Sequence, residues 1–177
     1  MVVPHQANTQ KQSARSARIP PHEAKTARIT PGLEPALVDC RRADIGALNP
    51  DDDRRFTIRV AGPAALLVAK AIKISERLAQ ADHRPDRVKE KDALDAFRIL
   101  QTVETDELVA GFRSHLANEH AASSSKLGAE ILRTHATSVD GQLPRLAARA
   151  AMDDPVVAAS FVVLTEALLA TINRTTT

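Results

Sequence analysis

Apolar residues are spaced most regularly between residues 62 and 100, where they predict two helices separated by a polar turn. Gly62-Pro63 begins the first helix, because proline at the first helical position loses no intrahelical hydrogen bond. Its apolar positions recur at helical spacing: Leu67, Ala71, Ile74 and Leu78. A proline-containing stretch at 82–88 predicts a loop. The second helix begins near Lys91, and its apolar face carries Ala96, Ile99 and Val103.

A basic stripe runs beside the apolar face of the first helix, a quarter turn away at about 100° per residue, and consists of Lys70, Lys73 and Arg77. Such a stripe is usually a solvated face, but lysines also bind phosphate groups as point charges. Asp92 and Asp95 lie in the first turns of the second helix, where the helix dipole favours acids. Asp92 also projects onto the apolar face of the second helix, where an unpaired carboxylate is costly. We therefore expect Asp92 and Lys70 to approach each other.

Alternation of apolar and polar residues predicts strands before the helices. The clearest strand is 55–60, where Phe56, Ile58 and Val60 would form a buried face. Weaker strands are predicted at 33–39, as an edge strand because it contains a proline, and at 41–48. Two or three strands would form a small antiparallel sheet, and the helix that begins at Pro63 would cover its apolar face.

The remainder of the chain has a helical pattern. One helix is expected to begin at about Thr105, and another is expected to be capped by Ser123 to Ser125. Two more are expected on either side of the Asp153-Asp154-Pro155 segment. The last stretch, 156–172, is expected to be buried on several sides, and its length and polar flanks argue against a membrane span. The predicted fold class is α+β, with a small antiparallel sheet of two or three strands packed on a C-terminal helical bundle of five or six helices.

The predicted organisation is a single domain over 31–177, with strands in 31–61 and the helical bundle in 62–177. Residues 1–30 are predicted to be a disordered basic tail or the remnant of a longer protein, because they lack apolar periodicity and contain three prolines before residue 25. A nucleic-acid-binding arm is the alternative, although no aromatic residue lies among the basic ones to stack on bases. Residues 1–42 hold seven Lys and Arg against three acids, a balance of +4 (7 − 3) in a chain whose net charge is +2.

Composition narrows the functional classes. The single cysteine, Cys40, excludes an intrachain disulfide framework and any zinc site built from several cysteines. Low aromatic content predicts a core of Ala, Leu, Val and Ile. No apolar run of spanning length and no signal-peptide pattern is present, which predicts a cytoplasmic protein without a membrane partner.

Two local patterns resemble metal sites but are interpreted otherwise. Asp51, Asp52 and Asp53 follow Asn-Pro in a predicted turn, where adjacent side chains do not converge, so we interpret them as solvated. His115 and His120 are five residues apart, which does not place them on one helical face. No metal ligand is predicted from either pattern.

The segments AALLVAKAIKI (64–74) and EKDALDAFRIL (90–100) resemble the C-terminal part of bacterial nucleotidyltransferase-like proteins of the abortive-infection, type IV toxin–antitoxin kind. Lys70 and Lys73 match the family's lysine-containing helix motif. Lys91, Asp92 and Asp95, followed by Phe97, match its [RK]-D-x-x-D-[LIA]-[YF] motif. The resemblance covers roughly residues 26–103. It implies a nucleoside triphosphate and Mg²⁺ as cofactors, and an RNA or protein acceptor.

In the resembled family the catalytic half carries a G-S motif and a D-x-D metal-binding pair, and neither occurs in this chain as a strand-associated unit. The resemblance therefore predicts a truncated nucleotidyltransferase-like protein that binds nucleotide or RNA phosphates but is not catalytically complete alone. Its predicted substrate-binding residues are Lys70, Lys73, Lys91, Asp92 and Asp95. A separate catalytic chain would supply the missing motifs, adding strands at the edge formed by 33–39. The alternative is a non-enzymatic helical interaction module, or an inert remnant.

Overall fold

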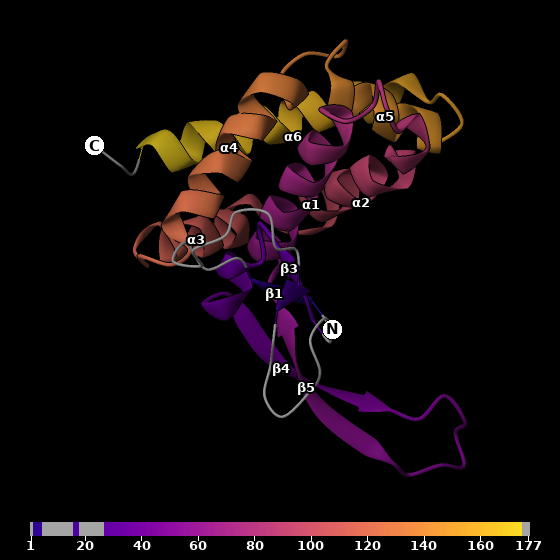
Figure 1. Cartoon of the computed structure of the whole chain (residues 1–177), viewed down its shortest axis with the longest axis vertical. Coiled ribbons are helices and arrows are strands. Elements are labelled where there is room, and N and C mark those ends of the chain that lie inside the picture. Colours follow the sequence, from indigo (N-terminus) through magenta and orange to yellow (C-terminus); the bar gives the residue numbers. More distant parts are fainter. Residues whose placement is uncertain (1, 5–15, 18–26, 175–177) are drawn as a thin grey trace.

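The computed structural model describes residues 2–4, 16–17 and 27–174 of the 177-residue chain. Two small sheets precede six α-helices in this part of the chain, so the predicted α+β fold class with a C-terminal helical bundle is confirmed (Figure 1). The α-helices are α1 (Pro63–Leu78), α2 (Glu90–Thr102), α3 (Thr105–Leu116), α4 (Ala122–Ala136), α5 (Gln142–Ala150) and α6 (Pro155–Arg174). A short 3₁₀ helix, η2 (Pro85–Arg87), lies in the predicted loop between α1 and α2.

The first sheet has three very short strands, β1 (Val2–Pro4), β2 (Ser16–Ala17) and β3 (Ala27–Thr30), in the order β1-β3-β2. β1 runs parallel to β3, and β2 runs antiparallel to it. These strands were not expected, because residues 1–30 show no alternation of apolar and polar side chains. Most of the predicted disordered tail lies outside the described residues.

The predicted strand at 33–39 is wrong, because this segment forms the 3₁₀ helix η1 (Glu34–Leu37). Pro35 lies in its first turn, where the missing N–H and fixed φ of proline suit a helix start better than a strand. The Glu34 carboxylate accepts hydrogen bonds from the Gly32 N–H at 2.9 Å and from the Ser124 hydroxyl at 2.7 Å, which fastens η1 to α4. The sheet edge that was expected to receive strands from another chain is therefore absent at 33–39.

The second sheet is a hairpin of β4 (Cys40–Gly46) and β5 (Arg55–Ala61). The bounds of these strands nearly match those of the two remaining predicted strands, at 41–48 and 55–60. The hairpin extends away from the helices (Figure 1). Phe56 is 66% exposed and Ile58 is 44% exposed, so the expectation that α1 covers the apolar face of this sheet is wrong. The alternation identified the strands and their two faces, but only the tertiary structure determines whether a face is covered.

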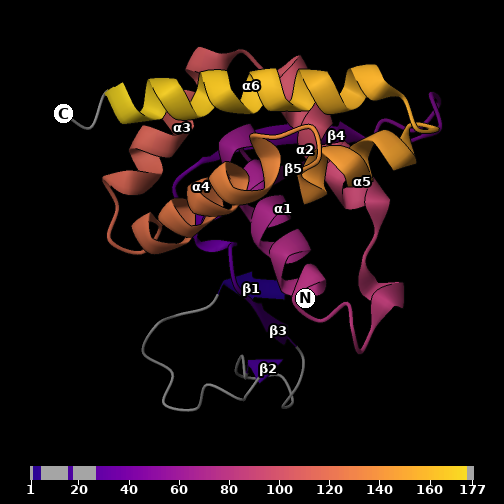
Figure 2. The same cartoon turned by 90° about the horizontal axis from the view of Figure 1, so that it is seen from above.

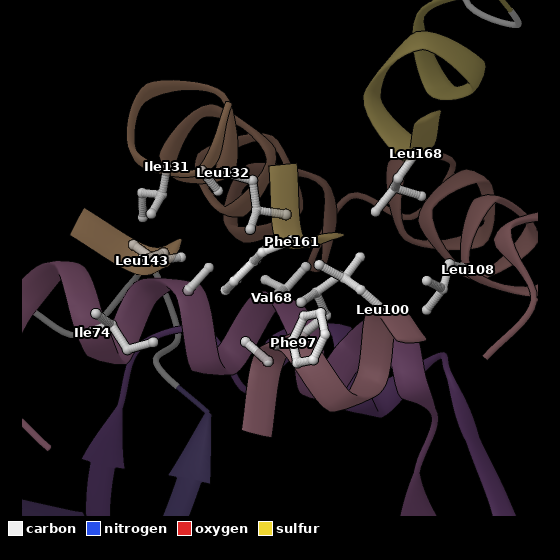
Figure 3. Close-up of a cluster of buried hydrophobic side chains, with 14 of the residues drawn as sticks. Val68, Ile74, Phe97, Leu100, Leu108, Ile131, Leu132, Leu143, Phe161 and Leu168 are labelled. Atoms are coloured by element: carbon white, nitrogen blue, oxygen red, sulfur yellow. The ribbon is translucent and has the colours of Figure 1, made fainter. Parts of the chain in front are cut away.

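The core of the bundle surrounds α1, which packs against α2, α3 and α4. Its apolar stripe is buried as predicted at Leu67, Ala71 and Ile74. Figure 3 shows side chains from α1, α2, α3, α4, α5 and α6 meeting in this core. Where α2 meets α6, the ring centroids of Phe97 and Phe161 lie 5.9 Å apart. Small residues allow the helices to approach closely, and a Cβ on Gly111 of α3 would lie 2.5 Å from the Cβ of Ala64 on α1.

α6 spans the length of the bundle (Figure 2). By length and composition alone it is the one described helix that is long and apolar enough to cross a membrane, which is weak evidence because core helices meet the same criteria. It was expected to be buried on several sides, and that expectation is wrong. One face buries Phe161, Thr165, Leu168, Leu169 and Ile172, whereas Val156 and Val163 are exposed.

Candidate functional site

The basic stripe of α1 and the two aspartates of α2 form one hydrogen-bonded ion cluster. The Lys70 ammonium donates to Asp92 Oδ1 at 2.9 Å and to Asp95 Oδ2 at 2.8 Å. Lys73 donates to Asp92 Oδ1 at 2.8 Å, and the Arg77 guanidinium donates to Asp92 Oδ2. The predicted approach of Lys70 and Asp92 is therefore confirmed. We call Lys70, Lys73, Arg77, Asp92 and Asp95 the lysine–aspartate cluster.

Helix geometry explains why these side chains converge. The three cations occupy positions separated by three and four residues on α1, so they share one helical face. Asp92 and Asp95 are three residues apart in the first two turns of α2 and also share a face. Because α1 and α2 pack against each other, the two faces meet along the helix–helix contact.

Asp92 is the centre of the cluster, because it accepts hydrogen bonds from all three cations and is only 6% exposed. Burial alone would raise the pKa of this carboxyl, but hydrogen bonds from Lys73 and Lys70 outweigh it and hold the pKa below its usual value. Burial likewise opposes the charge of Lys70, and its hydrogen bonds to Asp95 and Asp92 raise its pKa above the usual value. Both groups are therefore held in their charged forms.

Cations outnumber carboxylates in this region. The Arg98 guanidinium lies 3.7 Å from Asp95 on the exposed side of α2, so four cations surround two aspartates. The Lys73 side chain is 42% exposed and is the most accessible of the three α1 cations. The cluster and the neighbouring Arg98 thus present an excess of positive charge to solvent, at the side chains of Lys73 and Arg98.

Lys91 was predicted to belong to the site, but the structure does not bring it into the cluster. It is exposed, and within the described ranges it makes no ion pair with Asp92 or Asp95. Adjacent helical residues point about 100° apart, so a lysine next to Asp92 in sequence faces another direction. The remaining four predicted residues are together.

The patterns that were set aside as metal sites do not converge. Asp51 and Asp53 are exposed, and Asp52 pairs with Arg54 in the same turn. His115 is fully buried, whereas His120 is exposed. Within the described part of the chain, no three side chains of His, Cys, Asp and Glu gather in a way that would hold a metal ion.

A second polar junction, which no pattern in the sequence predicted, lies between Asp39 and His115. The Asp39 carboxylate accepts a hydrogen bond from the Ala65 N–H at 3.0 Å and thereby caps the start of α1, because Gly62 at the N-cap has no side chain to do so. His115 Nε2 lies 3.4 Å from Asp39 Oδ2. Burial lowers the pKa of His115, and the Asp39 charge offsets only part of this effect.

Two sequence signals point toward this junction in retrospect. Gly62-Pro63 begins a helix without a capping side chain, which requires an acceptor from elsewhere in the fold. His115 continues the apolar spacing of Leu108 and Phe112 on α3, which indicates burial. Neither signal identifies Asp39 as the partner, because 26 residues and the whole hairpin separate Asp39 from Ala65.

The lysine–aspartate cluster is thus defined by geometry and charge. No protein-family model, no curated protein and no solved structure matches this chain. The nucleotidyltransferase-like relationship therefore stays a resemblance carried by the two helix motifs.

Proposed function

We propose that this protein binds a phosphate group of a nucleotide or an RNA at the lysine–aspartate cluster, and that it does not transfer a nucleotidyl group alone. The observation that carries the proposal is the charge excess, since Lys70, Lys73, Arg77 and Arg98 face only two aspartates. Phosphate is bound most readily where cations are already held in place and solvent can be displaced.

The members of the cluster have different roles in this proposal. Lys73 contacts the phosphate, because its side chain is the most exposed of the α1 cations and donates to only one carboxylate. Lys70 and Arg77 are positioning residues, as Asp92 and Asp95 hold them against α2. Asp92 keeps all three cations on one side of α1, and this arrangement lowers the entropy lost when a ligand binds.

Mg²⁺, which the family resemblance implies, does not fit the carboxylates of this cluster. Asp92 and Asp95 lie within hydrogen-bond distance of ammonium and guanidinium groups, and a divalent cation at the same oxygens would meet strong repulsion from them. Metal-dependent transfer would therefore need carboxylates from another chain or segment.

A labelled ATP analogue tests the proposal by fluorescence anisotropy, without added Mg²⁺ and at low salt. We expect saturable binding that Lys73→Gln weakens about tenfold or more, because this change removes one charge from the contact. Lys126→Gln, an exposed lysine on α4, is the matched control and should bind as the wild type does. A 5′-triphosphorylated RNA in place of ATP distinguishes an RNA end from a free nucleotide.

Two results would refute phosphate binding. One is the absence of saturable binding with either probe, and the other is an equal loss of affinity in Lys73→Gln and Lys126→Gln. In either case the cluster only joins α1 to α2.

The hairpin favours a second function, that of a helical interaction module. Ile45, Phe56 and Ile58 lie on one face of β4 and β5 and are 49%, 66% and 44% exposed. A two-stranded hairpin with an uncovered apolar face is marginally stable by itself. Exposed apolar surface of this kind typically marks contact with another protein.

A further inference from the structure

The outer edge of β4 is an open row of backbone hydrogen-bonding groups. In the described residues β4 pairs only with β5, and the antiparallel register is continuous from Cys40 opposite Ala61 to Gly46 opposite Arg55. Neither seven-residue strand contains a proline. Bulges, prolines, very short strands and charged side chains are the features that usually prevent an edge from pairing with another chain. The β4 edge has no proline, its pairing with β5 shows no bulge, and its charged residues, Arg41, Arg42 and Asp44, are of both signs.

The hydrogen bonds at the two ends of the hairpin show which residues face outward. The Gly62 N–H donates to the Asp39 carbonyl, and the Ala47 N–H donates to the Arg54 carbonyl. Since antiparallel strands alternate, odd-numbered residues of β4 bond to β5 and even-numbered residues direct their N–H and C=O groups to the outer edge. The outward residues are Cys40, Arg42, Asp44 and Gly46.

We propose that a second copy of this chain pairs with the β4 edge, antiparallel, about a two-fold axis that passes Ala43. In this register Cys40 lies opposite Gly46 of the second copy, and Arg42 lies opposite Asp44. All outward backbone groups of both strands are then used. The product is a four-stranded antiparallel sheet with the order β5-β4-β4-β5, formed by a closed, self-complementary interface.

Charge selects this register over its neighbours. Within one chain Arg42 lies directly opposite Arg59, an unfavourable pair of like charges, and in the described residues it has no ion-pair partner. The proposed register places Arg42 of each copy against Asp44 of the other. Shifting the axis by one residue gives a different result. An axis at Arg42 brings the two Arg42 side chains together, and an axis at Asp44 does the same for the two aspartates.

Apolar contacts favour the same register. On the apolar face of the hairpin it places Arg41 opposite Ile45 of the second copy, where the aliphatic part of the arginine covers an exposed side chain.

The β5 edge is a weaker competitor. Centred on Ile58, two β5 strands would place Thr57 opposite Arg59 and Arg55 opposite Ala61, without an opposite charge pair. This edge therefore lacks the electrostatic selection that β4 has.

This pairing deepens the interaction-module function and is independent of phosphate binding, since the hairpin and the lysine–aspartate cluster share no residue. Failure of one therefore leaves the other intact. Anisotropy with labelled ATP reports on the cluster, and the oligomeric state reports on the hairpin.

Sedimentation equilibrium of the full chain over a range of concentrations measures the dimer. We expect Arg42→Asp and Asp44→Arg each to raise the dimer dissociation constant about tenfold or more, because each change turns two opposite pairs into like pairs across the axis. The double variant Arg42→Asp/Asp44→Arg restores opposite charges and should return to within about threefold of the wild type. Arg55→Asp, on β5, is the matched control and should leave the constant unchanged.

Cysteine cross-linking tests the register. In a Cys40→Ala background, Ala43→Cys places two thiols on the axis at a non-hydrogen-bonded pair, where Cα atoms are about 4.5 Å apart and a disulfide can form. Ile45→Cys places them four residues apart along the sheet. Mild oxidation should give a covalent dimer for Ala43→Cys only.

Several results would overturn the proposal. They are a monomer at all concentrations, a dimer that neither single charge reversal weakens, a double variant that is no better than the single variants, or cross-linking at Ile45→Cys equal to that at Ala43→Cys. Helical circular dichroism of each variant verifies that the bundle remains folded.

Discussion

Replacing Asp92 by alanine tests the lysine–aspartate cluster most directly, because one buried carboxylate accepts hydrogen bonds from Lys70, Lys73 and Arg77. Removing one partner of a fully buried pair costs about 3–5 kcal/mol, whereas an exposed pair contributes about 0–1 kcal/mol. The Asp92 environment lies between these limits. The carboxylate is buried, but Lys73 can turn toward water and Lys70 keeps its bond to Asp95.

We therefore expect Asp92→Ala to lower the free energy of unfolding by about 2–3 kcal/mol, which for a chain of this length lowers Tm by roughly 4–12 °C. Asp95→Ala should cost about 0.5–1 kcal/mol, because Asp95 is more exposed and Lys70 keeps its bond to Asp92. Glu76→Ala, an exposed acid on α1, is the control for loss of a negative charge. Urea denaturation at pH 7 measures the free energy of unfolding of the three variants. The values can be compared if this free energy falls with urea concentration at the same slope in each variant.

The cluster also has a pH signature. The pKa of Asp92 is lowered in the folded chain, so its contribution is present above about pH 4 and is lost as pH falls through the folded pKa. The pKa of Lys70 is raised, so its contribution is present below about pH 10.4 and is lost as pH rises through the folded pKa. Asp92→Ala should weaken both dependences. A loss of less than about 0.5 kcal/mol, or equal losses in Asp92→Ala and Asp95→Ala, would refute the central role of Asp92.

The pKa of the buried His115 is lowered, so below about pH 6.5 the unfolded chain binds a proton that the folded chain does not. The free energy of unfolding should therefore decrease as the pH is lowered. His115→Gln should flatten urea midpoints measured between pH 7.5 and 5.5, and parallel profiles for wild type and variant would contradict this. Gly111→Ala should lower the free energy of unfolding by about 1 kcal/mol or more, because its Cβ would lie 2.5 Å from that of Ala64 and overpacking exceeds the gain in helix propensity. Gly46→Ala, where a Cβ meets nothing within 4 Å, is the control, and equal stability of the two variants would show that α1 and α3 adjust freely.

Much of the fold followed from the sequence because the helices carry their signals locally. Gly62-Pro63 marks the start of α1, and the spacing of Leu67, Ala71 and Ile74 identifies its buried face. The pairing of Lys70 with Asp92 was also predictable, since a carboxylate on an apolar helical face requires a cation, and the neighbouring helix supplies one.

Tertiary structure decided the features that depend on distant partners. Alternation along 55–60 predicts a strand with an apolar face, but Phe56 is exposed because the hairpin extends away from α1 instead of lying on it. The position of Pro35 is compatible with an edge strand or a helix start, and hydrogen bonds from Gly32 and Ser124 to the Glu34 side chain favour the helix.

The cap of α1 was beyond sequence analysis for the same reason. Gly62 has no capping side chain, and the acceptor comes from Asp39, which only the closed hairpin brings to the helix start. Periodicity records which side chains of one element share a face. It contains no information on which distant element meets that face, because that contact depends on the packing of the whole chain.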